Sequence, residues 1–418
     1  MNMKMALLLV PCLLTACAQK SRTPAVWFDE ATRVLQKNYY GYQVEKLKPL
    51  VEKHQNQFQT RCSSGCSWQD AERALQNLLT ELGDSHTSYR TPEQLKQDQT
   101  DQRPDVGMRM AFLPEKQAHV ILRVQEGSPA AKAGMRRGDA ITAVNGVPCT
   151  PANQKLLKKT IQSGKPFKVS FESKNTGQKE LALQSTVAST GYVPTLSTQN
   201  LPAGVGLLTV PDFDAWEKIS PRIHALVKQA TDAKLNTLIV DLRDNPGGYV
   251  YEMLSSASAF MKQVDLIDAY PKSQVHLVGW EGKIRQVGKL YLPFIYKAPP
   301  AAFWKGKVIA LVNRRTASAA EVLAYNLQLQ KRALVIGEPT RGLMNTTTDN
   351  YKLSNGGALS ITITRSLDTN KKPYPERITP DLQVKDDLLA LMDTGKDVML
   401  ERAIRLAQSG TAVPEGVR

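Results

Sequence analysis

The chain has 418 residues, of which 42% are hydrophobic and 22% charged, and its formal net charge is +15. This composition excludes a disordered or collagen-like chain and supplies enough apolar material for two or three folded domains. Because the basic residues are spread along the chain and not clustered with aromatic residues, the excess charge indicates a solvated basic surface; we expect no nucleic-acid partner.

The first twenty residues, "MNMKMALLLVPCLLTACAQK", have the pattern of an export signal. Lys4 precedes an apolar stretch, Ala6 to Leu14, that is too short to span a bilayer. The next residues, "LTAC", resemble a bacterial lipobox, which implies cleavage after residues 1–16 and lipid attachment to the Cys17 thiol. A conventional secretory signal cut slightly later is the alternative.

The expected location is therefore the bacterial cell envelope, with the protein attached to a membrane through the lipid on Cys17. In such lipoproteins an aspartate after the cysteine often means retention in the inner membrane. Ala18 stands there instead. The sequence thus favours the outer membrane or its periplasmic face.

Residues 17–103 are predicted to form a helical N-terminal region that ends in "GDSHTSYR". Residues 25–57 have helical spacing of apolar positions. A second helix is predicted from Trp68 to Leu82, with Ser67 as its N-cap and Gly83 as its stop signal.

Three cysteines follow the lipobox, and their spacing agrees with an exported chain. Cys62 and Cys66 flank a short Ser-Ser-Gly turn in "RCSSGCSW". A metal site would need two further ligands nearby, so a local disulfide in an oxidising compartment is the better prediction. Cys149 is then unpaired, and we expect it to be buried.

Residues 104–192 change to short β-rich runs with glycine and proline turns. "GSPAAKAGMRRGD" leads into the strand "AITAVNG", and this order strongly resembles a PDZ domain. The resemblance implies a loop whose backbone amides hold a peptide's C-terminal carboxylate, followed by strand addition. That loop is predicted at Val106, Gly107, Met108 and Arg109. A PDZ-shaped spacer without a ligand is the alternative.

Residues 200–390 alternate strands and helices, which predicts an α/β core, and residues 391–418 supply a closing helix and a tail. The strand "KVIALV" is followed by "RTASAAEVLAYN", so Ser318 falls at a strand-to-helix junction. A serine there suits a nucleophile because the helix dipole and nearby amides favour negative charge, but it also suits an N-cap. The "DNPGG" turn after "LIVDLR" places Gly247 and Gly248 where bare amides approach a ligand.

Four blocks occur in an order that resembles the C-terminal processing proteases and tricorn-like serine peptidases. They are "LGDSHTSY", the PDZ segment, "LIVDLRDNPGG" and "NRRTASAAEVLAYNLQLQKRALVIGEPT". The resemblance implies a ClpP/crotonase-like α/β core with an inserted PDZ domain and a small helical N-terminal region. It matches the nucleophile to Ser318, followed by Glu321, and assigns the oxyanion hole to the amide of Gly247 or Gly248 together with that of Ala319.

The sequence departs from the processing-protease pattern at the general base. Those relatives carry a lysine in "GEPTFGKG", whereas this chain reads "GEPTRGLMN", with Leu343 at the lysine position. A leucine accepts no proton, so another base is required. The tricorn-like branch uses a histidine from the N-terminal region, which matches His86, with Ser85 and Glu376 as the residues that orient it. A purely structural role for His86 is the alternative.

The sequence therefore predicts a serine endopeptidase that cleaves polypeptides in the cell envelope, with the PDZ domain holding substrate C-terminal ends or controlling access. No metal and no organic cofactor are implied, and the oligomeric state is not indicated. Two alternatives remain: a binding protein on the same fold without hydrolytic activity, and a PDZ scaffold that delivers substrates to another protease.

Overall fold

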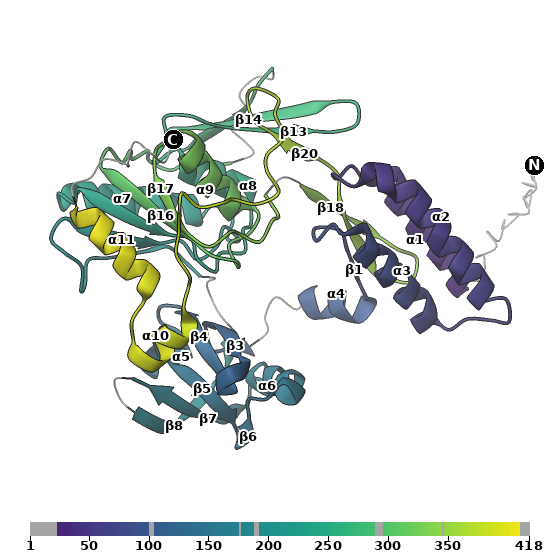
Figure 1. Ribbon diagram of the computed structural model, residues 1–418, viewed down its shortest axis with the longest axis horizontal. Coiled ribbons are helices and arrows are strands. Elements are labelled where there is room, and N and C mark those ends of the chain that lie inside the picture. The colour runs from purple at the N-terminus through teal and green to yellow at the C-terminus, as the bar shows by residue number, and fades with distance from the viewer. Residues whose placement is uncertain are drawn as a thin grey trace, which may run out of the picture. The chain divides into compact units, whose positions relative to one another are not determined.

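The computed structural model describes residues 23–99, 104–174, 177–187, 192–288, 296–344 and 347–409 (Figure 1). The predicted signal sequence, the Cys17 lipid site and the C-terminal tail lie outside the described residues. The chain divides into two compact units. The first holds residues up to Tyr39, Gln43–Leu95 and Asn350–Ile361; the second holds Tyr40–Tyr42, Lys96–Asp349 and the chain from Thr362.

Three helices and a small sheet make the first unit. The helices are α1 (Pro24–Asn38), α2 (Val44–Arg61) and α3 (Trp68–Leu82), and α4 (Pro92–Gln99) leads into the second unit. The sheet has the order β1-β19-β18, from Ser88–Arg90, Ala358–Thr362 and Thr348–Lys352. The helical pattern predicted over 25–57 is thus two helices, because the chain turns at Gly41.

The predicted boundaries of the third helix are confirmed. The Ser67 hydroxyl accepts from the Asp70 amide at 3.2 Å, and Gly83 ends the helix in the left-handed region at φ 72°. Its apolar stripe is buried from Ala71 onward, whereas Trp68 at the first position stays 40% exposed while it packs edge-on against Trp27.

The PDZ region of the second unit is a mainly antiparallel sheet of order β3-β4-β5-β7-β8, with β6 on β5. Its strands are β3 (Met108–Leu113), β4 (Ala118–Val124), β5 (Ala140–Val144), β6 (Val147–Pro148), β7 (Pro166–Ser173) and β8 (Gly177–Gln184), and β2 (Pro104–Asp105) pairs with β9 (Thr186–Val187). Its helices are α5 (Pro129–Lys132) and α6 (Gln154–Ile161), with short 3-10 turns at Pro114–Lys116 and Pro151–Asn153. Because β3 ends the sheet order, it has an edge available for strand addition.

The second region of this unit is an α/β core around one main sheet. The sheet order is β10-β11-β12-β16-β17-β21, parallel from β11 to β21 with β10 antiparallel at the edge. Its strands are Thr195–Ser197, Val205–Thr209, Thr237–Asp241, Lys307–Val312, Leu334–Gly337 and Leu382–Gln383. Every residue of β12 is buried, as expected for a parallel strand covered on both faces.

Helices cover the two faces of this sheet (Figure 1). Leu238 and Val240 point to the face covered by α7 (Ile219–Asp232), α8 (Val250–Ala257) and α9 (Ala319–Leu329). Ile239 points to the other face, where α11 (Val398–Gln408) packs through Met399 and Ala403. The C-terminal helix predicted from its amphipathic pattern therefore covers one face of the core sheet.

A smaller antiparallel sheet of order β15-β14-β13-β20 completes the second unit. Its strands are Lys283–Gln286, Gln274–Trp280, Val264–Ala269 and Arg365–Leu367, and α10 (Leu388–Thr394) precedes α11. Among the described residues, no helix has both the length and the apolar character needed to cross a bilayer.

Candidate active site

Ser318 lies at the junction between β16 and α9, in a backbone conformation that a serine rarely adopts. Its φ is 54° and its ψ −124°, and it occupies the N-cap position of α9. A non-glycine residue at positive φ costs on the order of 1–3 kcal/mol, and such residues cluster at functional sites. The geometry resembles other strand–serine–helix turns that expose a nucleophile at the edge of an α/β sheet.

Two buried polar residues tie this turn to the loop that follows β12. Thr316 is fully buried; its hydroxyl donates to the Leu242 carbonyl at 2.9 Å. Asn245 is also fully buried, and its backbone carbonyl accepts from the Ala317 amide at 2.9 Å. The strain at Ser318 is therefore supported on both sides by the loop after β12.

The "DNPGG" turn brings its glycines against the serine. A Cβ on Gly247 would lie 2.7 Å from the Ser318 Cβ and 3.0 Å from the Ala319 nitrogen, so only glycine fits there. The Gly247 amide donates to the Asn245 side-chain oxygen at 2.8 Å. Among the described residues, the amides of Gly248 and Ala319 donate to no protein atom. Of the two glycines predicted for the oxyanion hole, Gly248 is the one whose amide is uncommitted.

Glu321 connects the serine turn to the segment that carries Leu343. Its carboxylate accepts from the Ser318 amide at 2.7 Å, the Thr340 hydroxyl at 2.5 Å, and the Gly342 and Leu343 amides, each at 2.8 Å. Burial raises the pKa of Glu321, against the four hydrogen bonds that lower it. One carboxylate thus joins the backbone of Leu343, at the position of the lysine in the resembling proteases, to the backbone of Ser318.

His86 belongs to the first unit, in the turn between α3 and β1. The His86 amide donates to the Asp84 carboxylate at 3.0 Å, and the Thr87 amide donates to the Asp84 carbonyl at 3.1 Å. Ser85, which precedes His86, is exposed. Because Ser318 belongs to the second unit, the pairing of His86 with Ser318 stays a prediction.

Glu376, the second residue predicted to orient the histidine, lies in the second unit. Its side chain is 69% exposed and is 3.2 Å from the Arg377 guanidinium. A Cβ on Gly342 would lie 3.3 Å from its carboxylate, so Glu376 approaches the segment that also carries Leu343.

Two lysines near the motifs, Lys331 and Lys352, are not placed as substitutes for the missing base within the core. Lys331 follows the C-terminal end of α9, whereas Ser318 precedes its N-terminal end. A helix of this length is about 16 Å long, which puts Lys331 far beyond hydrogen-bond reach. Lys352 belongs to the return segment in the first unit.

Aromatic side chains gather next to Gly248. Trp216 packs edge-on against Tyr249 at 5.3 Å between ring centroids and against Tyr296 at 5.5 Å. Trp216 and Tyr249 remain 38% and 46% exposed. This exposed aromatic surface adjoins the "DNPGG" turn and could contact an apolar side chain of a ligand.

The predicted PDZ loop is tightly held by its surroundings. Val106 is fully buried, and its amide donates to the Asp105 carboxylate at 2.7 Å. Gly107 has φ 74°, and a Cβ there would lie 2.2 Å from the Ser128 Cβ. Met108 begins the edge strand β3. Position 107 therefore needs glycine, but the Val106 amide of the loop already donates to the Asp105 carboxylate.

The Arg109 side chain extends toward the α/β core. Its guanidinium donates to the Pro211 carbonyl and to the Asp212 carboxylate, each at 2.6 Å. A second PDZ arginine, Arg137, lies 3.3 Å from the Asp244 carboxylate. Two arginines thus join the PDZ region to the core, one at Pro211 and Asp212 and the other at Asp244, the first residue of the "DNPGG" turn.

Asp244 is the centre of this ion-pair group. Burial alone would raise the pKa of Asp244, but Arg315 at 2.5 Å and Arg137 outweigh it, so the pKa is lowered. Asn313 also donates to this carboxylate at 2.9 Å. These contacts hold the first residue of the "DNPGG" turn in place through three side chains.

Cys62 and Cys66 are paired as a disulfide, with their Cα atoms 5.0 Å apart. Cys149 is free and buried within the PDZ core, and burial raises its pKa to about 11. A thiol with that pKa is inert at neutral pH.

Sequence reasoning missed the residues that support the site. Asn245 stood inside the "DNPGG" block, and its side chain caps Gly247. Asn313 and Thr316 flank the two arginines that precede the serine turn, and they bond to each other and to the loop after β12. A polar residue just after a fully apolar strand is the signal that could have found them.

Two family models match the chain. Residues 204–384 match peptidase family S41, and residues 120–161 match the PDZ domain. The first match contains the glycine turn, Ser318, Glu321 and Glu376. The second contains α5 and α6 of the PDZ region.

Similar proteins are found among curated relatives and solved structures. The chain is 26% identical over 354 residues to the carboxyl-terminal-processing protease of Synechocystis sp., covering 81% of this chain and 77% of the relative. It is 25% identical over 363 residues to the protein of that name from Picosynechococcus sp., covering 83% and 81%.

A solved structure described as the photosystem II D1 C-terminal processing protease has a TM-score of 0.55 and 21% identity, and the match covers 93% of this chain and 98% of that one. The predicted fold class, an α/β core with an inserted PDZ sheet and N-terminal helices, is thereby confirmed.

Proposed function

We propose that this chain is an exported endopeptidase that cleaves polypeptides in the bacterial cell envelope, because residues 204–384 match peptidase family S41. Its homology to C-terminal processing proteases and its PDZ domain support polypeptide substrates recognised near their C-terminal ends. The lipobox ending at Cys17 supports attachment to the membrane, in the outer membrane or on its periplasmic face.

The mechanism starts at Ser318. Its hydroxyl oxygen attacks the carbonyl carbon of the scissile peptide bond while His86 accepts the hydroxyl proton, as in the tricorn-like branch. The negative charge that forms on the carbonyl oxygen is held by the amides of Gly248 and Ala319. The carbon–nitrogen bond then breaks, and the leaving amine takes the proton from His86.

Water completes the cycle. His86 removes a proton from a water molecule, whose oxygen attacks the ester carbon of the acyl-enzyme, and the ester bond to Ser318 breaks as the proton returns to the serine oxygen. In this mechanism Ser85 and Glu376 orient the imidazole of His86, so that one ring nitrogen stays available as a base. The exposed surface of Trp216 and Tyr249 receives an apolar side chain beside the scissile bond.

The observation that carries this proposal is the strained Ser318 against the "DNPGG" turn, where the amides of Gly248 and Ala319 donate to no protein atom among the described residues. The observation against it is Leu343, which removes the lysine base of the processing branch. A binding protein without hydrolytic activity is therefore the second candidate.

The test compares the purified mature protein with Ser318→Ala in the presence of an unfolded polypeptide. We expect new peptide termini, detected by mass spectrometry, with the wild type and none with the variant. Degradation at equal rates by both would assign the cleavage to a contaminant. No degradation by either would favour the binding protein. Intact mass of the protein extracted from membranes tests the anchor separately: Cys17 is expected to carry lipid, and an unlipidated mature chain contradicts it.

A further inference from the structure

Three successive backbone amides, those of residues 247–249, differ in what they bind. The Gly247 amide donates to the Asn245 side-chain oxygen at 2.8 Å, and the Tyr249 amide donates to the Phe213 carbonyl at 2.9 Å. The Gly248 amide between them donates to no protein atom in the described part of the chain. The turn therefore offers one amide to a ligand, with an occupied amide on either side.

Phe213 holds its side of the turn through backbone groups alone. Its amide donates to the Gly247 carbonyl at 2.7 Å, so Phe213 and Gly248 pair as neighbours in a parallel sheet do. Any residue at position 213 except proline has the same two backbone groups. The bond to the Gly247 amide is different, because it requires the side chain of Asn245.

The Asn245 side chain can bind this amide in one orientation only. Asn245 is fully buried, and its Nδ2 donates to the Val210 carbonyl at 2.9 Å. Turning the side-chain amide over would set Nδ2 against the Gly247 N–H and the oxygen against the Val210 carbonyl, so both bonds would be lost. Each buried group left without a partner costs about 1–3 kcal/mol. The Val210 carbonyl therefore directs the Asn245 oxygen toward Gly247.

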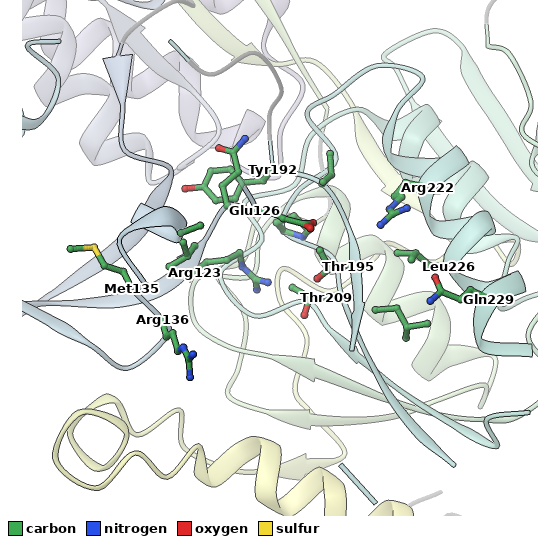
Figure 2. A pocket seen from close by; sticks show the side chains of 17 residues that line it. Arg123, Glu126, Met135, Arg136, Tyr192, Thr195, Thr209, Arg222, Leu226 and Gln229 are labelled. Carbon is green, nitrogen blue, oxygen red and sulfur yellow. The ribbon is translucent and has the colours of Figure 1, made fainter. Parts of the chain in front are cut away.

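Val210 directly follows β11, and the core fixes its position. Its amide donates to the Asp241 carbonyl at 3.0 Å, and its side chain is fully buried. Its neighbours Thr209 and Pro211 instead line a cavity of about 560 Å³ between the PDZ region and the parallel sheet. Figure 2 shows Thr209 among the side chains of this lining. Because Val210 is held by the sheet, its carbonyl is a fixed acceptor for Asn245.

The backbone of Asn245 is bonded to the serine turn. Its carbonyl accepts from the Ala317 amide at 2.9 Å, directly before Ser318. A Cβ on Gly247 would lie 2.7 Å from the Ser318 Cβ, so the glycine turn and the serine turn are in contact. Asn245 thus connects the end of β11, the glycine whose amide it occupies and the turn of the nucleophile.

We propose that Asn245 is the positioning residue that decides which glycine amide serves as the oxyanion donor. By occupying the Gly247 amide and holding the turn to Val210, it leaves the Gly248 amide for the carbonyl oxygen of the substrate. The oxyanion role rests on the peptidase function proposed above. The hydrogen bond from the Gly247 amide can be measured without any catalysis.

The test variant is Asn245→Asp, which keeps the shape of the side chain but titrates. When protonated, the new carboxyl group donates to the Val210 carbonyl and accepts from the Gly247 amide, as asparagine does. When ionised, it sets a second acceptor against that carbonyl. Burial raises the pKa of such a group above its usual value of about 3.9. The native arrangement is therefore kept in acid and lost as the pH rises through the raised pKa.

The charged groups beside this position belong to the ion pairs of Asp244. Among the described residues, no hydrogen bond joins Asn245 to a charged side chain. Asp244 precedes it and lies 3.3 Å from Arg137 and 2.5 Å from Arg315. These two arginines balance the charge of Asp244, so burial remains the main cause of the raised pKa in the variant.

The first readout is kinetic, on a peptide taken from the cleaved polypeptide. Loss of an oxyanion donor lowers kcat by about 10²–10³-fold, so at about pH 8 we expect kcat of Asn245→Asp to be at least about tenfold below that of the wild type, with KM unchanged. At about pH 5.5 the two should agree within about threefold, because the protonated side chain restores both bonds. A ratio that stays the same at both pH values overturns the proposal.

Asn326→Asp is the matched control. Asn326 is 3% exposed, and its Nδ2 also donates to a backbone carbonyl, that of Val322, at 2.9 Å. Its kcat should keep the pH dependence of the wild type. An equal loss in this control would assign the effect to a general destabilisation by a buried aspartate. Asn245→Ala carries no titratable group, so its loss should not recover in acid; recovery there would overturn the proposal as well.

The second readout follows the Gly247 amide directly. Pro246–Gly247 is the only Pro-Gly pair in the sequence, so isotopic labelling of proline carbonyl carbons and glycine nitrogens isolates this amide in NMR spectra. At the higher pH its exchange with solvent should be at least about tenfold faster in Asn245→Asp than in Asn326→Asp, and the difference should disappear in acid. Equal exchange in the two variants at the higher pH overturns the proposal.

The two readouts separate this inference from the proposed function. If the wild type cleaves nothing, the proposed function fails, whereas the exchange of the Gly247 amide still decides whether Asn245 occupies it. Thermal unfolding sets the higher pH of both readouts at a value where every variant is folded.

Discussion

Two glycine-containing loops of the second unit, residues 244–248 and residues 105–109, are both predicted from sequence to present backbone amides to an anion. In the first loop the Asn245 side chain takes the Gly247 amide and the Gly248 amide remains uncommitted among the described residues. In the second loop the Asp105 carboxylate takes the Val106 amide, and the Arg109 side chain turns to the peptidase core.

The difference shows that a glycine leaves its backbone amide accessible to a ligand but does not prevent a nearby side chain from bonding to an amide of the loop. A neighbouring Asn, Asp or Ser side chain competes for the same donor, and which amide it takes depends on the local turn. In the "DNPGG" turn the Gly248 amide stays uncommitted among the described residues, in the turn that packs against Ser318. In the PDZ loop the Val106 amide is taken by the residue before it, and the Arg109 side chain contacts the core.

The largest effect is expected at the nucleophile of the first loop's site. Ser318→Ala and His86→Ala should each lower kcat by about 10⁴-fold or more, and the double variant should be little worse than either. Non-additivity of this kind is the signature of a nucleophile and base that act as one unit. Initial rates on an unfolded polypeptide measure it. Retention of most activity by His86→Ala, with loss in Ser318→Ala, would make the tricorn-like assignment wrong.

The next effect concerns the uncommitted amide. Gly248→Ala should lower kcat by about 10²–10³-fold, because Gly248 has φ 133° and its new Cβ would meet the Phe213 carbonyl carbon at 2.3 Å. Gly288→Ala is the control, since Gly288 has φ 78° and nothing within 4 Å of an added Cβ. If Gly248→Ala lost no more activity than Gly288→Ala, the first loop would not be the oxyanion hole.

A third change tests the support of the serine turn. Glu321→Gln should lower the free energy of unfolding by about 1–3 kcal/mol, because its amide nitrogen would face two donors whichever way the side chain turns. Urea denaturation measures this value. Glu401→Gln on the exposed face of α11 is the control, and an equal loss there would deny Glu321 its structural role.

The same variant predicts a change in the pH dependence of stability. Because burial raises the folded-state pKa of Glu321 above the ordinary 4.5, the folded state binds the proton more tightly. This group's contribution is therefore greatest below pH 4.5 and is lost as the pH rises through the raised pKa. Glu321→Gln should remove that decline, and an unchanged pH profile would contradict the assignment.

The smallest effect is expected at the second loop. A peptide that ends in a free carboxylate should bind about tenfold tighter than its amidated twin, because charge-assisted hydrogen bonds to amides are lost in the twin. Fluorescence anisotropy with the Ser318→Ala protein avoids cleavage. Gly107→Ala should abolish the preference, whereas Gly127→Ala, with positive φ but open space around it, should keep it. Equal affinity for the two peptides would leave the domain as a spacer.

The sequence alone determined most of the local structure. The α/β alternation, the PDZ strands, the cap at Ser67 and the closing helix could be predicted because each depends on a short-range pattern of apolar spacing, turns and caps. The positions of Ser318 and of the two glycines could also be predicted from local patterns, because each follows a strand and the ends of these strands meet at one edge of a parallel sheet.

Only the tertiary structure decided which groups surround those positions. Three contacts show this: Asn245 binds the Gly247 amide, Glu321 accepts from four donors, and Arg109 contacts Asp212. They join residues that are distant in the chain, or they depend on a side-chain direction that no periodicity specifies. The return of residues 350–361 to the N-terminal helices is likewise invisible to a local pattern. Hydrogen bonds and ion pairs are directional and depend on the final approach of two backbones, whereas apolar burial depends on a face that the sequence already encodes.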